Sequence, residues 1–171
     1  MKNFEWKYIW QFLLIAAVQV LFLNNICLWG YITPLLYLLF VLTLPFQTPA
    51  WLVISSGFLM GMCVDLFSGV MGVHAASLTL VAFLRPLIMQ LIPHSAIEEH
   101  MRPILYDMHF PWFVSYTFSM ALIHQFLVYF FDVLSLSNFF HLLWMTLLNA
   151  SLTTVLIIIV QILLYNSSKR Y

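Results

Sequence analysis

Long apolar stretches with almost no charge inside them constrain this chain more than any other feature. Of its 171 residues, 64% are hydrophobic and 7% are charged, and the mean hydropathy is +1.00. Soluble domains carry about 25% charged residues, so this chain cannot surround a core with a water-soluble surface. The composition indicates an all-α integral membrane protein, with one transmembrane domain over residues 1–171. The formal net charge of +0 leaves no basic surface for nucleic acid.

Six stretches have the composition of membrane-spanning helices, which need about 20 apolar residues and tolerate somewhat fewer. They cover residues 8–23, 31–44, 50–67, 73–92, 111–131 and 139–165. The second has Pro34 in its first turn, where proline is tolerated, and Pro45 at its end. Because this stretch is short, a re-entrant segment is the alternative. The connection over residues 93–110 is polar, and its composition allows a short amphipathic helix on the membrane surface.

The basic residues orient this six-span arrangement. All Lys and Arg residues outside the spans then share the side of the two termini: Lys2, Lys7, Arg102, Lys169 and Arg170. The loops on the opposite side contain no Lys or Arg, and they cover residues 24–30, 68–72 and 132–138. Because cytoplasmic loops are enriched in Lys and Arg, we expect both termini in the cytoplasm. Five spans would place one basic terminus outside, so the charges favour six.

Two glycines and a carboxylate share one face of the third stretch. Gly57, Gly61 and Asp65 are spaced by four residues, and a helix places residues at this spacing one above another. Glycines at such a spacing allow a second helix to approach closely. We favour another helix of the same chain as the neighbour, and a helix of a partner protein is the alternative.

Asp65 lies near the outer end of the third span, and three roles are open for its carboxylate. It can cap the following turn, where Ser68 and Gly69 provide the chain reversal. It can accept hydrogen bonds from the next helix, for example from His74 or from a backbone amide. It can also belong to a substrate or proton site, because ionisable groups inside membrane segments are costly and often functional.

Arg85 lies in the fourth span, nearer its cytoplasmic end, and precedes Pro86. We favour a side chain that extends to the cytoplasmic headgroups over one that binds a specific partner. Pro86 has no N–H for the carbonyl of Ala82, so Arg85 or a neighbouring helix can bind that carbonyl. Since Asp65 and Arg85 lie toward opposite membrane faces, we do not expect them to pair.

No motif for catalysis or nucleotide binding occurs in the chain: GxSxG, the P-loop, HExxH and the Rossmann fingerprint are all missing. The cluster at residues 94–100 lacks the spacing of a zinc site, and Cys27 and Cys63 form no CxxC. We therefore expect no enzyme, no cofactor and no metal. Polar residues in the last two spans fit hydrogen bonds between helices: His124, Gln125, Asn149 and Thr153.

The block over residues 57–74 resembles the signature of the rod shape-determining protein MreD family. In that family a GF-x-x-G-x-x-x-D helix runs into a G-x-x-G-x-H/N turn. The matching residues here are Gly57, Phe58, Gly61, Asp65, Gly69, Gly72 and His74. Pro34 and the pair Leu44-Pro45 are also similar to the family pattern upstream, and the length and helix layout agree.

This resemblance implies a fold and a role. The fold would be a six-transmembrane-helix bundle similar to the S component of energy-coupling-factor vitamin transporters. MreD-like proteins sit in the bacterial cytoplasmic membrane with MreC and the actin-like MreB, alongside RodA and a penicillin-binding transpeptidase. They act as scaffolds of the machinery that builds the lateral peptidoglycan wall. Structural or partner-contact roles are then expected for Pro34, Pro45, Gly57, Gly61, Asp65, Gly69, Gly72 and His74, with less family support for Arg85.

Two functions follow as hypotheses. The first is a non-catalytic scaffold for cell elongation that binds MreC directly and the other proteins indirectly, with the Gly57/Gly61 face as one candidate contact. The alternative is a small-molecule binder, such as a vitamin-binding S component or a carrier of a lipid intermediate. It would need an apolar cavity with a few polar groups, for which the candidates are Asp65, His74, His124 and Asn149.

Overall fold

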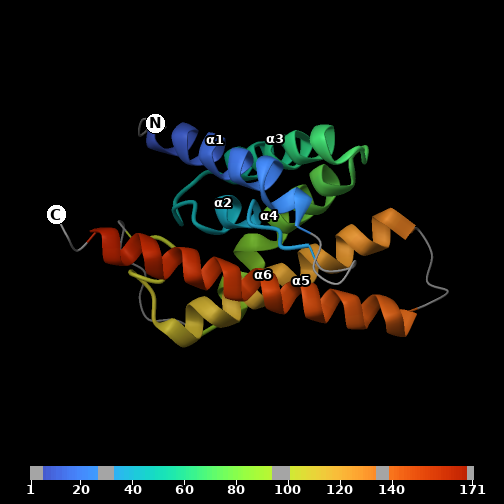
Figure 1. Ribbon diagram of the computed structural model, residues 1–171. Helices are drawn as coiled ribbons and strands as arrows, with labels where there is room; N and C mark the ends of the chain where they lie inside the picture. Colours follow the sequence, from blue (N-terminus) through green and yellow to red (C-terminus); the bar gives the residue numbers. More distant parts are fainter. Residues whose placement is uncertain (1–5, 27–32, 94–100, 134–138, 169–171) are drawn as a thin grey trace.

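The computed structural model describes residues 6–26, 33–93, 101–133 and 139–168, and this part of the chain is helical without strands. Five of its helices are long and apolar enough to cross a membrane, which makes the chain a multi-pass membrane protein. They are α1 (Trp6–Leu21), α3 (Ala50–Ser68), α4 (Val73–Leu91), α5 (Phe110–Val133) and α6 (Phe139–Ser168), shown in Figure 1. These five match five of the six predicted spans. A 3-10 turn, η1 (Leu23–Asn25), ends the first span.

The predicted second spanning helix over residues 31–44 is wrong for the described residues 33–44. Only α2 (Leu38–Leu42) is helical there, and its five residues rise by about 7.5 Å. Residues 33–35 have no helical turn, and the helix begins only after the two-residue turn at Leu36 and Tyr37. Pro34 disfavours a helical conformation of the residue before it. Side chains of other helices bind the N–H groups of residues 33 and 35–37, so this part of the backbone does not depend on helical hydrogen bonds. We call residues 33–44 the strap.

The strap nevertheless runs back along the bundle. Near the C-terminal end of α1, Gln19 accepts the N–H of Leu36 at 2.7 Å. Two turns earlier in α1, Gln11 donates to the hydroxyl of Thr43 at 3.0 Å. The strap is therefore antiparallel to α1, and the chain makes its second passage through the bundle mostly without helix.

Successive passages of the chain alternate in direction when the strap is counted as the second passage. Asn24 donates to the Ser68 hydroxyl at 3.0 Å, so the C-terminal ends of α1 and α3 meet and the two helices are parallel. In Figure 1, α5 and α6 form one layer and α1 to α4 form the other, and the start of α1 and the end of α6 lie at the same end of the molecule. We call this the termini end. The side chain of Arg102 lies there too, 5.4 Å from the ring of Tyr8.

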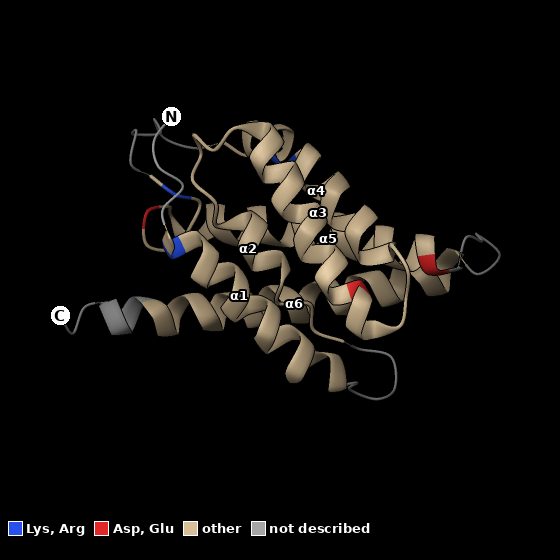
Figure 2. Cartoon of the chain, turned by 90° about the horizontal axis from the view of Figure 1, so that it is seen from above, with Lys and Arg blue, Asp and Glu red and all other residues tan. Residues whose placement is uncertain are grey.

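The strap forms the centre of the core. Every residue from Pro34 to Leu44 is buried, and α1, α4, α5 and α6 all contact it. The outward faces of the long helices carry exposed apolar side chains, for example Trp10, Leu66, Phe83 and Phe140. Figure 2 shows how few charged residues interrupt these helices. This inside–outside pattern suits a lipid environment, where an apolar exterior costs nothing.

The polar connection between α4 and α5 is described over residues 101–109, and these residues form turns and not the expected surface helix. The carboxylate of Asp107 accepts the backbone N–H of Arg102 at 2.9 Å, which closes this part of the loop on itself. Residues 94–100 and Cys27 lie outside the described part, and Cys63 is a half-buried free thiol.

Candidate functional site

The Gly57/Gly61 face is where α3 and α4 meet. A Cβ atom at Gly61 would lie 2.5 Å from Cα of Ala75 and 2.6 Å from the carbonyl oxygen of His74. At Gly57 it would lie 3.3 Å from Ala82 Cβ. Only a residue without a side chain allows this approach at Gly61. The neighbour is thus a helix of the same chain, and the interpretation of this face as a partner contact is wrong because α4 covers it.

Asp65, one turn after Gly61, binds the first turn of α4. Its Oδ1 accepts the N–H of His74 at 3.0 Å, and its Oδ2 accepts the N–H of Ala75 at 2.9 Å. The first N–H groups of a helix have no partner within that helix, and a negative charge is favourable beside them. Asp65 therefore caps α4 from the neighbouring helix, which corresponds to the second of its three open roles.

The turn between α3 and α4 depends on two other glycines. Gly69 ends α3 with φ 70°, and Gly72 precedes α4 with φ 82°. Residues that have a side chain rarely adopt such positive φ values. Ser68 donates to Val64 O at 2.9 Å and so belongs to α3 itself. The chain reversal is thus made by glycine conformation, and Asp65 is free to bind α4.

One end of the strap is held by side chains of α1 and α6. The Gln19 amide accepts the N–H groups of Leu36 (2.7 Å) and Tyr37 (3.3 Å) and donates to the carbonyl of Pro34 (3.2 Å). From α6, Asn149 accepts the N–H of Thr33 at 2.9 Å, and Thr153 accepts the N–H of Leu35 at 3.3 Å. These side chains replace the backbone partners that a helix would have supplied.

The other end of the strap is held by α4 and α5. Arg85 donates through a terminal nitrogen to the carbonyl of Leu44 and through Nε to the hydroxyl of Tyr116 at 3.2 Å. Tyr116 in turn donates to the carbonyl of Leu42 at 3.3 Å. Pro45, directly after the strap, begins a turn in which its carbonyl accepts the N–H of Thr48 at 3.1 Å.

The structure corrects the favoured interpretation of Arg85. Its side chain is only 4% exposed, so it does not extend to the headgroups. The carbonyl it binds belongs to Leu44 and not to Ala82, one turn before Pro86. Asp65 binds the start of α4, and Arg85 binds the far end of the strap, so the two do not pair, as expected.

The middle of the core contains a hydrogen-bonded cluster of His74 and His124, both named from the sequence, around Tyr37, which was not predicted. The hydroxyl of Tyr37 lies 2.8 Å from Nδ1 of His74 and 2.9 Å from Nε2 of His124. A phenol donates one hydrogen, so one of the two imidazoles must donate its own N–H to the Tyr37 oxygen. His124 Nδ1 is buried without a partner among the described residues. The available signal was Tyr37, one of two tyrosines in the apolar stretch 31–44, and the sequence pattern alone does not distinguish it from a core aromatic.

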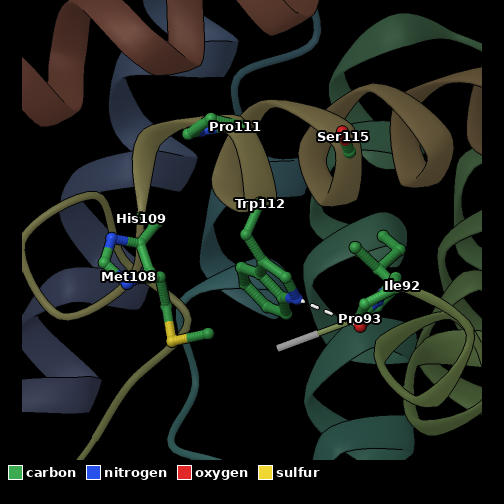
Figure 3. A pocket seen from close by; sticks show the side chains of 7 residues that line it. All are labelled: Ile92, Pro93, Met108, His109, Pro111, Trp112 and Ser115. Carbon is green, nitrogen blue, oxygen red and sulfur yellow. Dashed lines mark hydrogen bonds between the residues drawn. The ribbon is translucent and has the colours of Figure 1, made fainter. Parts of the chain in front are cut away.

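A cavity of about 510 Å³ lies away from these residues, between the end of α4, the turns before α5 and the start of α5. Figure 3 shows its lining, in which the Trp112 indole donates to the carbonyl of Ile92 at 3.4 Å. The lining residues are Ile92, Pro93, Met108, His109, Pro111, Trp112 and Ser115. None of the residues proposed from the sequence lines it. Within the described residues, no group of three His, Cys, Asp or Glu side chains could hold a metal ion.

The geometry defines a class: a helical multi-pass membrane protein in which buried polar side chains bind the protein's own backbone. Comparisons of the chain with protein-family models, with curated proteins and with solved structures found no match.

Proposed function

We propose that this chain is a non-catalytic scaffold of the bacterial cell-elongation machinery that binds MreC directly in the cytoplasmic membrane, with both termini in the cytoplasm. MreB, RodA and a penicillin-binding transpeptidase would be indirect partners. The resemblance of residues 57–74 to the MreD signature supports this role. The charge pattern supports the orientation, since Lys7 and Arg102 lie toward the same end of the bundle.

One observation carries the non-catalytic part of the proposal. Each of the four polar residues named for a ligand site makes an internal contact, and of their side-chain atoms in the described residues only His124 Nδ1 is buried without a partner. Asp65 caps α4, Asn149 binds the strap, and His74 and His124 share the Tyr37 hydroxyl. A small-molecule site of the S-component type would need these groups to point into a cavity, so this alternative has less support.

The partner contact belongs on an outward apolar face, because the Gly57/Gly61 face is covered. In lipid, such faces associate through close van der Waals packing. Exposed aromatic side chains mark three of them, with Trp10 on α1, Phe83 on α4 and Trp144 on α6.

The test is site-specific photocrosslinking in cells. A photoreactive amino acid replaces Trp10, Phe83 or Trp144 in turn, and a fourth variant carries it at Phe113, which is fully buried on α5. We expect an adduct with MreC from at least one exposed position and none from Phe113. Efficient crosslinking to lipid alone from every exposed position would contradict the proposal. A stoichiometric small metabolite retained by the purified protein, detected by mass spectrometry, would favour the S-component alternative.

A further inference from the structure

We propose that the strap, together with the helix α3 that directly follows it, is the last part of the chain to take its place in the membrane, after α6 has been inserted. Backbone N–H and C=O groups cannot remain unpaired in lipid, so non-helical backbone at membrane depth must be buried in protein. The strap therefore cannot enter the membrane before the groups that bind its backbone are in place. This inference rests on the strap's contacts and not on the identity of any partner.

The groups that bind the strap come mostly from later in the chain. Arg85 lies 41 residues after Leu44, and Tyr116 lies 74 residues after Leu42. The α6 partners are the most distant: Asn149 lies 116 residues after Thr33, and Thr153 lies 118 residues after Leu35. Of the side chains that bind the strap backbone in the described part of the chain, Gln19 alone precedes it. Because a chain is synthesised from its N-terminus, these later partners are missing when the strap is made.

Because α1 and α3 are parallel, late insertion of the strap changes the side of the membrane on which the segment between the strap and α3 lies. The segment over residues 45–49 reaches the termini end only when the strap has crossed, because the strap connects it to the far end of α1. Its sequence, Pro-Phe-Gln-Thr-Pro, contains no charged residue. Because α3 begins at Ala50, directly after this segment, α3 must enter the membrane with it. Residues 45–64 contain no charged residue, so this late passage moves no charge across the bilayer, where each charge would be costly. Until α6 is in place, we expect residues 45–49 at the opposite side.

Gln47 offers a reporter for this passage, because its side chain is exposed within that segment. The full-length chain carries Gln47→Cys together with Cys27→Ser and Cys63→Ser. A membrane-impermeant maleimide is applied from either side of the membrane. In the chain with intact strap contacts, we expect labelling from the side of the termini only.

Removing the α6 contacts should change this sidedness. In the double variant Asn149→Leu/Thr153→Val, we expect a several-fold rise in labelling of Gln47→Cys from the side opposite the termini. The matched control, Ser151→Ala/Thr154→Val, removes two hydroxyls from the same stretch of α6. Both of these bind carbonyls of α6 itself, at Leu147 and Ala150, so the control should label like the parent. Parent-like sidedness in the Asn149→Leu/Thr153→Val variant would overturn the proposal.

A pulse–chase experiment tests late insertion of the strap without any change to the strap contacts. It can be done even if the double variant is degraded. Newly made Gln47→Cys chains should label from the side opposite the termini immediately after synthesis and move to the termini side during the chase. Labelling confined to the termini side at the earliest time would contradict late insertion.

Discussion

Individual polar residues in this protein act as substitutes for missing backbone partners. Asp65 supplies acceptors for the start of α4. Gln19 supplies one acceptor oxygen, which binds two N–H groups of the strap, and one donor, which binds a strap carbonyl. A buried backbone group without a partner costs about 1–3 kcal/mol. Each of these side chains therefore affects stability through the groups it would leave behind, more than through the strength of its own hydrogen bonds.

Replacing Asp65 should destabilise the α3–α4 pair. Asp65→Ala leaves the N–H groups of His74 and Ala75 without acceptors, so we expect a loss of about 1–3 kcal/mol in the free energy of unfolding. Asp65→Asn keeps one acceptor and should lose less. The measurement is reversible unfolding of the purified protein in mixed micelles, with Asp132→Asn as the control because Asp132 is exposed. Equal stability of Asp65→Ala and the parent would show that the cap is not needed.

Two glutamines of α1 give a matched pair of variants. Gln19→Leu leaves two N–H groups and a carbonyl of the strap unpaired, and we expect a loss of about 2–4 kcal/mol. Gln11→Leu removes one hydrogen bond to the Thr43 hydroxyl, which also donates to the carbonyl of Leu39. That change should cost about 0.5–1 kcal/mol. The same unfolding assay compares the two, and a smaller loss for Gln19→Leu than for Gln11→Leu would contradict the role assigned to Gln19.

At the scale of secondary-structure elements, the long helices follow from local pattern and the strap does not. Each long helix has enough consecutive apolar residues to pair its own backbone across a membrane. The glycine spacing also predicted close packing against a helix of the same chain, and the structure shows this packing at Gly61. The strap has the same apolar composition but depends on residues up to 118 positions away. Such distant partners cannot be identified from the local pattern of a single sequence.

The contact between α3 and α4 should respond unequally to one added methyl group. Gly61→Ala places a Cβ atom 2.5 Å from the backbone of α4, so the helices must separate. Gly57→Ala meets Ala82 Cβ and the carbonyl oxygen of Leu78 at 3.3 Å, and a small shift of α4 accommodates it. We expect a loss of about 1–3 kcal/mol for Gly61→Ala and a clearly smaller one for Gly57→Ala. Comparable unfolding free energies for the two variants would show that the helices do not approach as described.

At the scale of the whole molecule, six passages of the chain bring the start of α1 and the end of α6 to one end, although only five of the passages are made by long helices. The count of five helices alone would have placed the termini on opposite sides. The even number of passages agrees with the charge pattern, which needed six spans but could not show that one of them is mostly non-helical. The candidate ligand site was less predictable. Of the polar residues proposed for it, Asp65 and Asn149 bind backbone N–H groups, and His74 and His124 bind the Tyr37 hydroxyl.

The sidedness of the termini can be tested directly. Fusions of a reporter that is active only in the cytoplasm are made at the N-terminus and, separately, at the C-terminus. The positive charge near both ends predicts activity for both fusions. A fusion to the turn at Met71, which is almost fully exposed, should be inactive. Activity at one terminus only would require an odd number of passages.

The central claim is that a buried, mostly non-helical strap crosses the bundle with its backbone bound by side chains. Amide hydrogen exchange of the full-length protein in lipid nanodiscs tests it most directly. We expect the amides of Leu35, Leu36 and Tyr37 to exchange as slowly as those in the middle of α3, because Thr153 and Gln19 bind them in the core. Exchange of these three amides as fast as that of the turns at residues 101–109 would contradict it.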